Sequence, residues 1–177
     1  MKRSLGALLA LVAAVLPRAA QAQRTPLSVE PRVGIVAPVG STADEERTGF
    51  AVGADVIVRV TPLVSVYGGY AWQGAGVAGV DSVDVSFYGW SGGVRLTLEP
   101  WGPYTPFLKS GLVYKRGTAD FDSGTTLVGD WATGFEVAAG VELGVLGGRA
   151  ALSPQVGFSS VQNDQWAYVQ VGLHVRI

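Results

Sequence analysis

The last twelve residues of the chain, WAYVQVGLHVRI from Trp166 to Ile177, alternate between two kinds of side chain. One parity is apolar, running from Val169 to Ile177, and the other is polar or small, running from Tyr168 to Arg176. A period of two residues is typical of a β-strand with one apolar face. Chain ends usually fray. Alternation that continues to the final carboxylate therefore predicts that this strand is paired along its whole length.

The same alternation recurs upstream. It is found in residues 27–37, 49–60, 64–73, 87–98, 106–115, 131–145 and 150–159. With the C-terminal strand this predicts about eight strands, an even number. No stretch after Ala22 carries apolar residues at helical spacing, which excludes an alternating α/β fold.

The connections between these strands alternate in length. Short turns are expected at residues 60–63, 99–103 and 146–149, and longer polar or glycine-rich loops at 39–48, 74–82 and 116–130, with a brief fourth loop at 160–164. Short turns on one side and longer loops on the other are typical of an up-and-down barrel of the outer-membrane type. The predicted fold is therefore all-β, an eight-stranded antiparallel up-and-down transmembrane β-barrel.

Composition supports strands in a membrane. Of the 177 residues, 48% are hydrophobic and only 15% are charged, compared with about a quarter in soluble domains. No apolar run after the N-terminus approaches the roughly 20 residues of a spanning helix. The chain has no cysteine, which excludes a disulfide scaffold or a thiolate site.

The N-terminus predicts export. Lys2 and Arg3 precede an apolar stretch, and small residues close it at Ala20 to Ala22, as in a secretory cleavage site. We therefore expect residues 1–22 to be a cleaved signal peptide and residues 23–177 to form the barrel domain. The alternative, a short anchor helix, is disfavoured because the run is short and Pro17 interrupts it.

Removal of the signal peptide changes the charge of the protein. Lys2, Arg3 and Arg18 would leave with it, which takes the formal net charge from -1 to -1 - 3, or about -4. No basic surface for nucleic acid is left.

The polar face of the strands indicates which side is the interior. Glycines such as Gly53, Gly69 and Gly140 stand between its charged residues, whereas a solvated outer face would be dense in charge and poor in glycine. Small residues beside a few opposite charges suit a narrow barrel interior. A soluble lipocalin-like barrel with inverted faces is the alternative. The predicted interior polar network consists of Glu30, Arg32, Asp55, Arg59, Arg95, Lys109, Glu136, Glu142, His174 and Arg176.

Aromatic residues gather at the predicted strand ends, as they do in the two interfacial girdles of membrane barrels. Packing in a soluble β core is the alternative. Those nearest the long loops are Tyr70, Trp72, Tyr88, Trp90, Tyr114 and Trp131, and those near a short turn are Trp101 and Tyr104.

The whole expected mature chain resembles small bacterial outer-membrane β-barrel proteins, the group that includes the OmpA transmembrane domain and OmpX-like proteins. The resemblance is clearest in VEPRVGIVAPVG at residues 29–40 and YVQVGLHVRI at residues 168–177. It implies location in the outer membrane, contact with the bilayer and lipopolysaccharide, and recognition of the last strand by the outer-membrane assembly machinery. That family usually ends in an aromatic residue, where this chain has Ile177.

No motif in the sequence predicts catalysis, a cofactor or a metal site. Members of the family that modify lipid A use a His with a Ser and an acid, but the H-x-S spacing is missing at His174, whose parity points inward. Acidic residues at Asp44, Glu45, Glu46, Asp120 and Asp122 match no calcium loop and are expected to be solvated.

Eight strands enclose a lumen that side chains can fill. We therefore expect a monomeric structural or surface-interaction protein with a role in adhesion or resistance. A narrow channel for small solutes or ions is the alternative.

Overall fold

The computed structural model describes residues 27–40, 47–77, 80–145, 149–162 and 164–177, and within these it leaves the side chains of residues 80–82 undescribed. The predicted signal peptide and Asp44, Glu45 and Glu46 lie outside the described residues. The strands are β1 (Leu27–Pro38), β2 (Gly49–Arg59), β3 (Val64–Val77), β4 (Val80–Thr97), β5 (Tyr104–Phe121), β6 (Thr126–Val128), β7 (Ala132–Val145), β8 (Ala150–Val161) and β9 (Asp164–Arg176).

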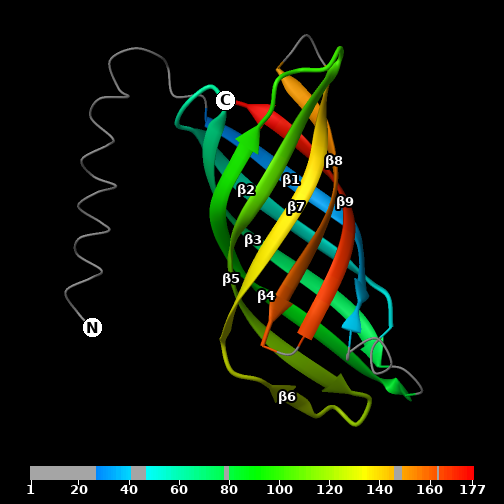
Figure 1. The fold of residues 1–177 in the computed structure, drawn as a ribbon. Helices are drawn as coiled ribbons and strands as arrows, with labels where there is room; N and C mark the ends of the chain where they lie inside the picture. The colour runs from blue at the N-terminus through cyan, green and yellow to red at the C-terminus, as the bar shows by residue number, and fades with distance from the viewer. Residues whose placement is uncertain (1–26, 41–46, 78–79, 146–148, 163) are drawn as a thin grey trace, which may run out of the picture.

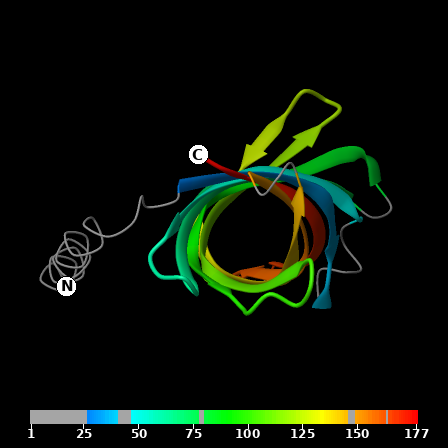
Figure 2. The same ribbon diagram turned by 90° about the horizontal axis from the view of Figure 1, so that it is seen from above.

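Eight of the strands close into a barrel (Figures 1 and 2). Each is antiparallel to its neighbours, and the order is β4-β3-β2-β1-β9-β8-β7-β5, closed by pairing of β4 with β5. The last strand pairs with the first from Ser28↔Arg176 to Pro38↔Trp166. The amide of Ile177 also donates to the carbonyl of Leu27 at 2.9 Å. This closure explains why the alternation continues to the end of the chain, and the predicted fold class is confirmed.

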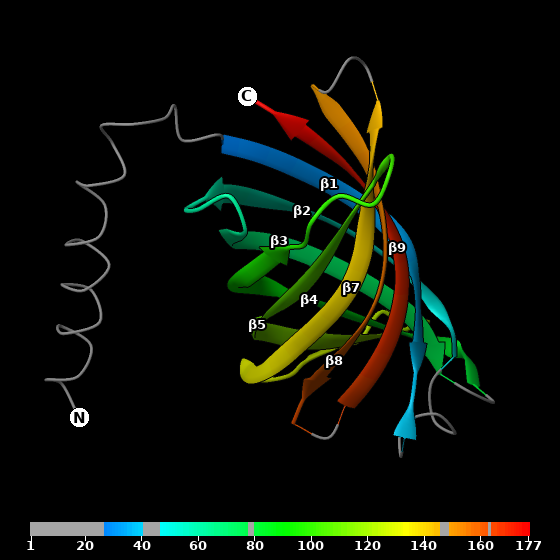
Figure 3. The ribbon, with the colours of Figure 1, turned by 45° about the horizontal axis from the view of Figure 1, so that its top comes forward.

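The two ends of the barrel differ, and the figures allow them to be told apart. The described chain starts and stops at the end that carries the connections 60–63 and 98–103, the last residues of β7 and the first residues of β8, which we call the turn end (top of Figure 1). The opposite end carries β6 and the last residues of β1, β3 and β8, and we call it the loop end. Strands cross the barrel at a marked tilt between these ends (Figure 3), as closure of a barrel requires.

Two of the predicted long loops are largely strand. The structure extends β3 to Val77 and starts β4 at Val80, and it extends β5 to Phe121, where β6 pairs with it. Polar residues do not prevent backbone pairing, as Asp84↔Asp120 shows. The sequence predicted shorter strands because the residues at these strand ends show no apolar alternation. The hairpin of β5 and β6 projects beyond the barrel (Figures 1 and 2).

The apolar parity of the strands faces outward. Val56 and Val33 are 47% and 56% exposed, whereas Asp55 and Glu30 on the other parity are each 1% exposed. Because outward-facing and inward-facing residues alternate along each strand, a slip of one residue in pairing would exchange the two faces. None of the described residues belongs to a helix long and apolar enough to cross a membrane.

Candidate functional site in the barrel lumen

A first cluster of charges lies in the middle of the lumen, and we call it the middle cluster. Asp55 accepts hydrogen bonds from Arg32 and from Nζ of Lys109, the latter at 2.7 Å. Lys109 also lies 3.6 Å from Oε1 of Glu136, and that oxygen accepts a 2.7 Å bond from the hydroxyl of Tyr67. Four strands supply these charges, β1, β2, β5 and β7. Two acids and two bases balance, as buried ions require.

A second cluster lies nearer the turn end, and we call it the turn-end cluster. Arg95 donates to Glu30 at 2.8 Å and to Glu142 at 2.6 Å, so one guanidinium joins carboxylates from β1 and β7. Nδ1 of His174 lies 3.3 Å from Oε2 of Glu30. The ring of Phe107 lies 3.6 Å from Cζ of Arg95 and packs against the cation.

Two of the residues assigned to the interior network lie at its edge instead. The side chain of Arg176 is 45% exposed and reaches Glu142 only at 3.9 Å, because β9 ends there at the turn end. Arg59 is half-buried, lines a small void beside Arg95 and forms no ion pair with a described residue. Both have inward parity, but parity alone does not report how far a residue lies from the mouth of a barrel.

The loop-end half of the lumen is filled differently. Trp166, Tyr168, Val36, Ala51, Ala75 and Ala138 form a buried apolar cluster, and Phe87 packs against it. Phe87 comes from β4 and Trp166 from β9 on the opposite wall, and their ring centroids are 5.6 Å apart. We call this group the apolar plug. These residues were not predicted as part of the site, although their inward parity is visible in the sequence.

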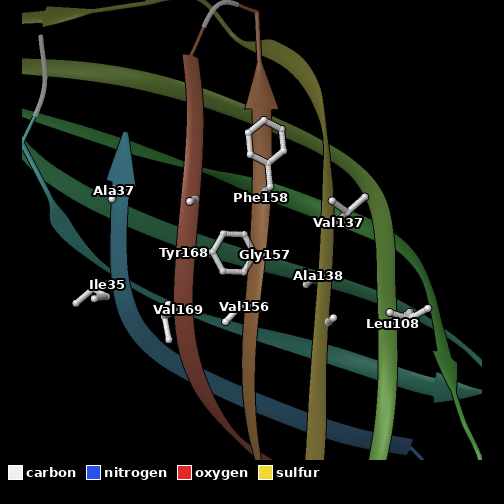
Figure 4. A pocket seen from close by; sticks show the side chains of 12 residues that line it. Ile35, Ala37, Leu108, Val137, Ala138, Val156, Gly157, Phe158, Tyr168 and Val169 are labelled. Atoms are coloured by element: carbon white, nitrogen blue, oxygen red, sulfur yellow. The ribbon is translucent and has the colours of Figure 1, made fainter. Parts of the chain in front are cut away.

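Tyr168 is positioned by a glycine. Its ring lies against Gly157 on the neighbouring strand, where a Cβ would overlap the ring (Figure 4). The absence of a side chain at Gly157 therefore leaves room for a large aromatic residue within a narrow barrel.

Little free volume remains between the two charged clusters and the plug. One void beside Arg32, Glu136 and Tyr168 has about 30 Å³, and another beside Arg95 and Glu142 has about 10 Å³. A single water needs roughly 10–15 Å³. These voids have room for one or two waters.

The predicted interfacial aromatics point away from the lumen. Near the loop end they form contacts with one another: Tyr70 with Trp90 at 5.0 Å, Trp131 with Tyr88 at 5.9 Å, and Trp131 stacked on Tyr114 at 4.8 Å between ring centroids. Trp72 packs on Phe50 at 5.0 Å. At the turn end, Trp101 is 81% exposed and is bridged through its backbone to Tyr104.

The outer face also carries a shallow apolar groove of about 540 Å³. It crosses β1, β9, β8, β7 and β5, with larger side chains such as Ile35, Phe158 and Leu108 around smaller residues such as Gly157 and Ala138 (Figure 4). Most of its lining is outward-facing, but Tyr168 of the apolar plug also reaches it beside Gly157.

Within the part of the chain that the structure describes, no group of three or more His, Asp or Glu side chains is arranged to hold a metal ion. Asp120 accepts a 2.6 Å hydrogen bond from Thr126 in the β5–β6 hairpin. Asp122 is exposed next to it.

Several solved structures have a similar fold. Neisserial surface protein A superposes with a TM-score of 0.70 at 16% identity, covering 85% of this chain and 97% of that one. The attachment invasion locus protein Ail of Yersinia pestis gives 0.56 at 13% identity, covering 88% and 100%. The N-terminal β-barrel domain of Pseudomonas aeruginosa OprF gives 0.57 at 12% identity, covering 87% and 98%. At these identities the likeness is one of fold.

A search of curated proteins finds no match. The model of one family, described as the outer membrane protein beta-barrel domain, matches residues 6–158, which is most of the chain. The closed eight-stranded barrel, its apolar outer face and this match together assign the protein: it belongs to the outer membrane protein beta-barrel domain family.

Proposed function

We propose that this protein is a structural and surface-interaction barrel of the outer membrane, with a closed lumen and a loop end that faces the outside of the cell. The observation that carries the proposal is the filling of the lumen. Two clusters of paired charges and the apolar plug occupy successive levels of it, and the voids beside them are about 10 and 30 Å³. A barrel without an open lumen acts through its outer face and its loops.

The proposal includes partners and a route. The apolar outer face contacts lipid, and the loop-end aromatics lie where lipopolysaccharide begins. Residues 1–22 are removed as a signal peptide, and β9, which closes the barrel, is the strand that the assembly machinery recognises. The barrel acts as a monomer.

We infer no catalytic role for His174. It is 4% exposed, faces the lumen and contacts the carboxylates Glu30 and Glu142. Ser153 is fully buried at 0% exposure. A lipid substrate reaches the outer face of the barrel, so neither side chain is accessible to it.

Conductance separates the closed barrel from the channel alternative. Purified protein reconstituted into planar bilayers should show no large, steady conductance at physiological salt. Reproducible current steps that change in size when Arg59 or Glu136 is neutralised would support a channel instead. Protein heated before reconstitution provides the blank.

Labelling in intact cells tests the orientation. The chain has no native cysteine, so a single introduced cysteine is a unique site. Ser123→Cys lies in the exposed turn between β5 and β6, and Pro62→Cys lies in the turn between β2 and β3. A membrane-impermeant maleimide should label the first variant in intact cells and the second only after lysis. The reverse pattern would contradict the proposed orientation.

A further inference from the structure

A cavity of about 180 Å³ opens at the loop end of the lumen, and we call it the vestibule. It is smaller than the roughly 300–1,000 Å³ of drug-sized sites, so it suits a small molecule. Strands from opposite walls of the barrel contribute to it. The side chains that matter for its chemistry are Gln73, Phe87, Lys115, Asp130 and Trp166.

One side of the vestibule offers unused hydrogen-bond donors. Nζ of Lys115 donates to Oε1 of Gln73 at 3.1 Å, and Lys115 forms no ion pair with a described residue. An ammonium has three donors. The amide nitrogen of Gln73 is buried without a hydrogen-bond partner, and Gln73 is only 7% exposed. Buried donors without acceptors are destabilising, so this side is suited to a carboxylate.

The rim of the vestibule is acidic and its floor is apolar, unlike the side that carries Lys115 and Gln73. Asp130, between β6 and β7, brings an exposed carboxylate to the same cavity and forms no ion pair with Lys115. The floor is apolar, because the rings of Phe87 and Trp166 meet there at 5.6 Å between centroids. A cation, a separate acid and an aromatic surface therefore line one small space.

We propose that the vestibule binds an α-amino acid with an apolar side chain. Its carboxylate is held by Lys115 and the amide of Gln73, its ammonium faces Asp130, and its side chain packs on Phe87 and Trp166. A phosphate or dicarboxylate is repelled by Asp130, and a simple amine leaves the donors of Lys115 and Gln73 unfilled. This inference does not depend on the proposed surface role.

Three probes that share a phenyl ring test the charge pattern. They are L-phenylalanine, 3-phenylpropanoate, which lacks the amine, and phenethylamine, which lacks the carboxylate. Binding is followed in detergent-solubilised full-length protein by the ¹⁵N-indole resonance of Trp166, assigned with Trp166→Phe. Each lost charge-assisted contact is worth at least about 1.4 kcal/mol, or about tenfold in Kd. L-phenylalanine should therefore bind at least about tenfold more tightly than either analogue.

Two variants test which residue binds the carboxylate of the ligand and which binds its ammonium. Lys115→Met should raise the Kd for L-phenylalanine to that of phenethylamine and leave phenethylamine unaffected, while Asp130→Asn should weaken phenethylamine and spare 3-phenylpropanoate. Arg149→Met, which changes the same charge at the turn end, should alter none of these values. Equal affinity for all three probes, or no shift of the Trp166 resonance with any, overturns the proposal. The series on the unmodified protein decides this even if a variant does not fold.

Discussion

The two halves of the lumen are filled by opposite chemistry. Toward the turn end and the middle, carboxylates and cations from most strands meet in pairs, whereas toward the loop end the apolar plug joins opposite walls by ring contacts. Charges need particular partners in particular registers, while apolar side chains need only volume. The difference suggests that the charged half sets the strand register and the plug closes the barrel where its loops begin.

The largest effect is expected from breaking the middle cluster. Asp55→Ala leaves Arg32 and Lys109 buried without their nearest carboxylate, since their side chains are 5% and 4% exposed. Removing one partner of a buried pair costs about 3–5 kcal/mol. Urea unfolding in lipid vesicles, followed by tryptophan fluorescence, measures the loss.

A double variant sharpens this result. Asp55→Ala with Lys109→Met returns the cluster to a balance of one acid and one base, and should be less destabilised than Asp55→Ala alone. Asp122→Ala, an exposed acid in the hairpin turn, serves as the control and should not change the midpoint. Additive losses would show that Asp55 and Lys109 do not act as a pair.

The next effect concerns the outer face behind the clusters. Val56 is 47% exposed and is paired with Val29 and Gly68 in neighbouring strands. An arginine on the lipid face near the midplane costs about 2–4 kcal/mol, so Val56→Arg should lower the stability in vesicles by that amount. Val56→Leu is the apolar control. An unchanged unfolding curve for Val56→Arg would indicate that this face contacts water.

Much of the fold could be predicted from alternation, and the reason is physical. Side chains in a barrel strand alternate between the lipid and the lumen with a period of two residues. Parity alone therefore places Val56 outside and Asp55 inside. Loop lengths could not be predicted in the same way. Asp84 and Asp120 pair through their backbones beyond the apolar band, where side chains no longer report the strand.

The sequence did not reveal how deep each charged residue lies in the lumen or with which residue it pairs. The sequence placed Arg95 and Arg176 on the same inward parity, but only the structure shows that Arg95 joins two carboxylates and that Arg176 lies at the rim. Pairing across the lumen depends on register and strand tilt, which single-strand patterns do not contain. The plug was missed for a related reason: Phe87 and Trp166 meet only because their strands lie on opposite walls.

The apolar plug should tolerate substitution that the charged half does not. Phe87→Leu keeps an apolar side chain but loses the edge contact with Trp166, and such changes cost about 1 kcal/mol. The same unfolding measurement checks this value. A loss as large as that of Asp55→Ala would mean that the plug is as strictly specified as the ion clusters and would remove the contrast between the two halves.

The smallest effect is expected at the rim of the turn-end cluster, where two arginines approach the same carboxylate. Arg95 touches Glu142 at 2.6 Å with a side chain that is 3% exposed, while Arg176 reaches it at 3.9 Å with 45% exposed. Solvent-exposed ion pairs contribute about 0–1 kcal/mol, because water screens them. Arg176→Gln should therefore lower the free energy of unfolding by less than about 1 kcal/mol, and high salt should abolish this difference. Arg95→Gln, in contrast, leaves Glu30 and Glu142 without their shared guanidinium and should be strongly destabilising. Unfolding curves of both variants at low and high salt measure the difference, and equal losses for the two would place Arg176 inside the buried cluster after all.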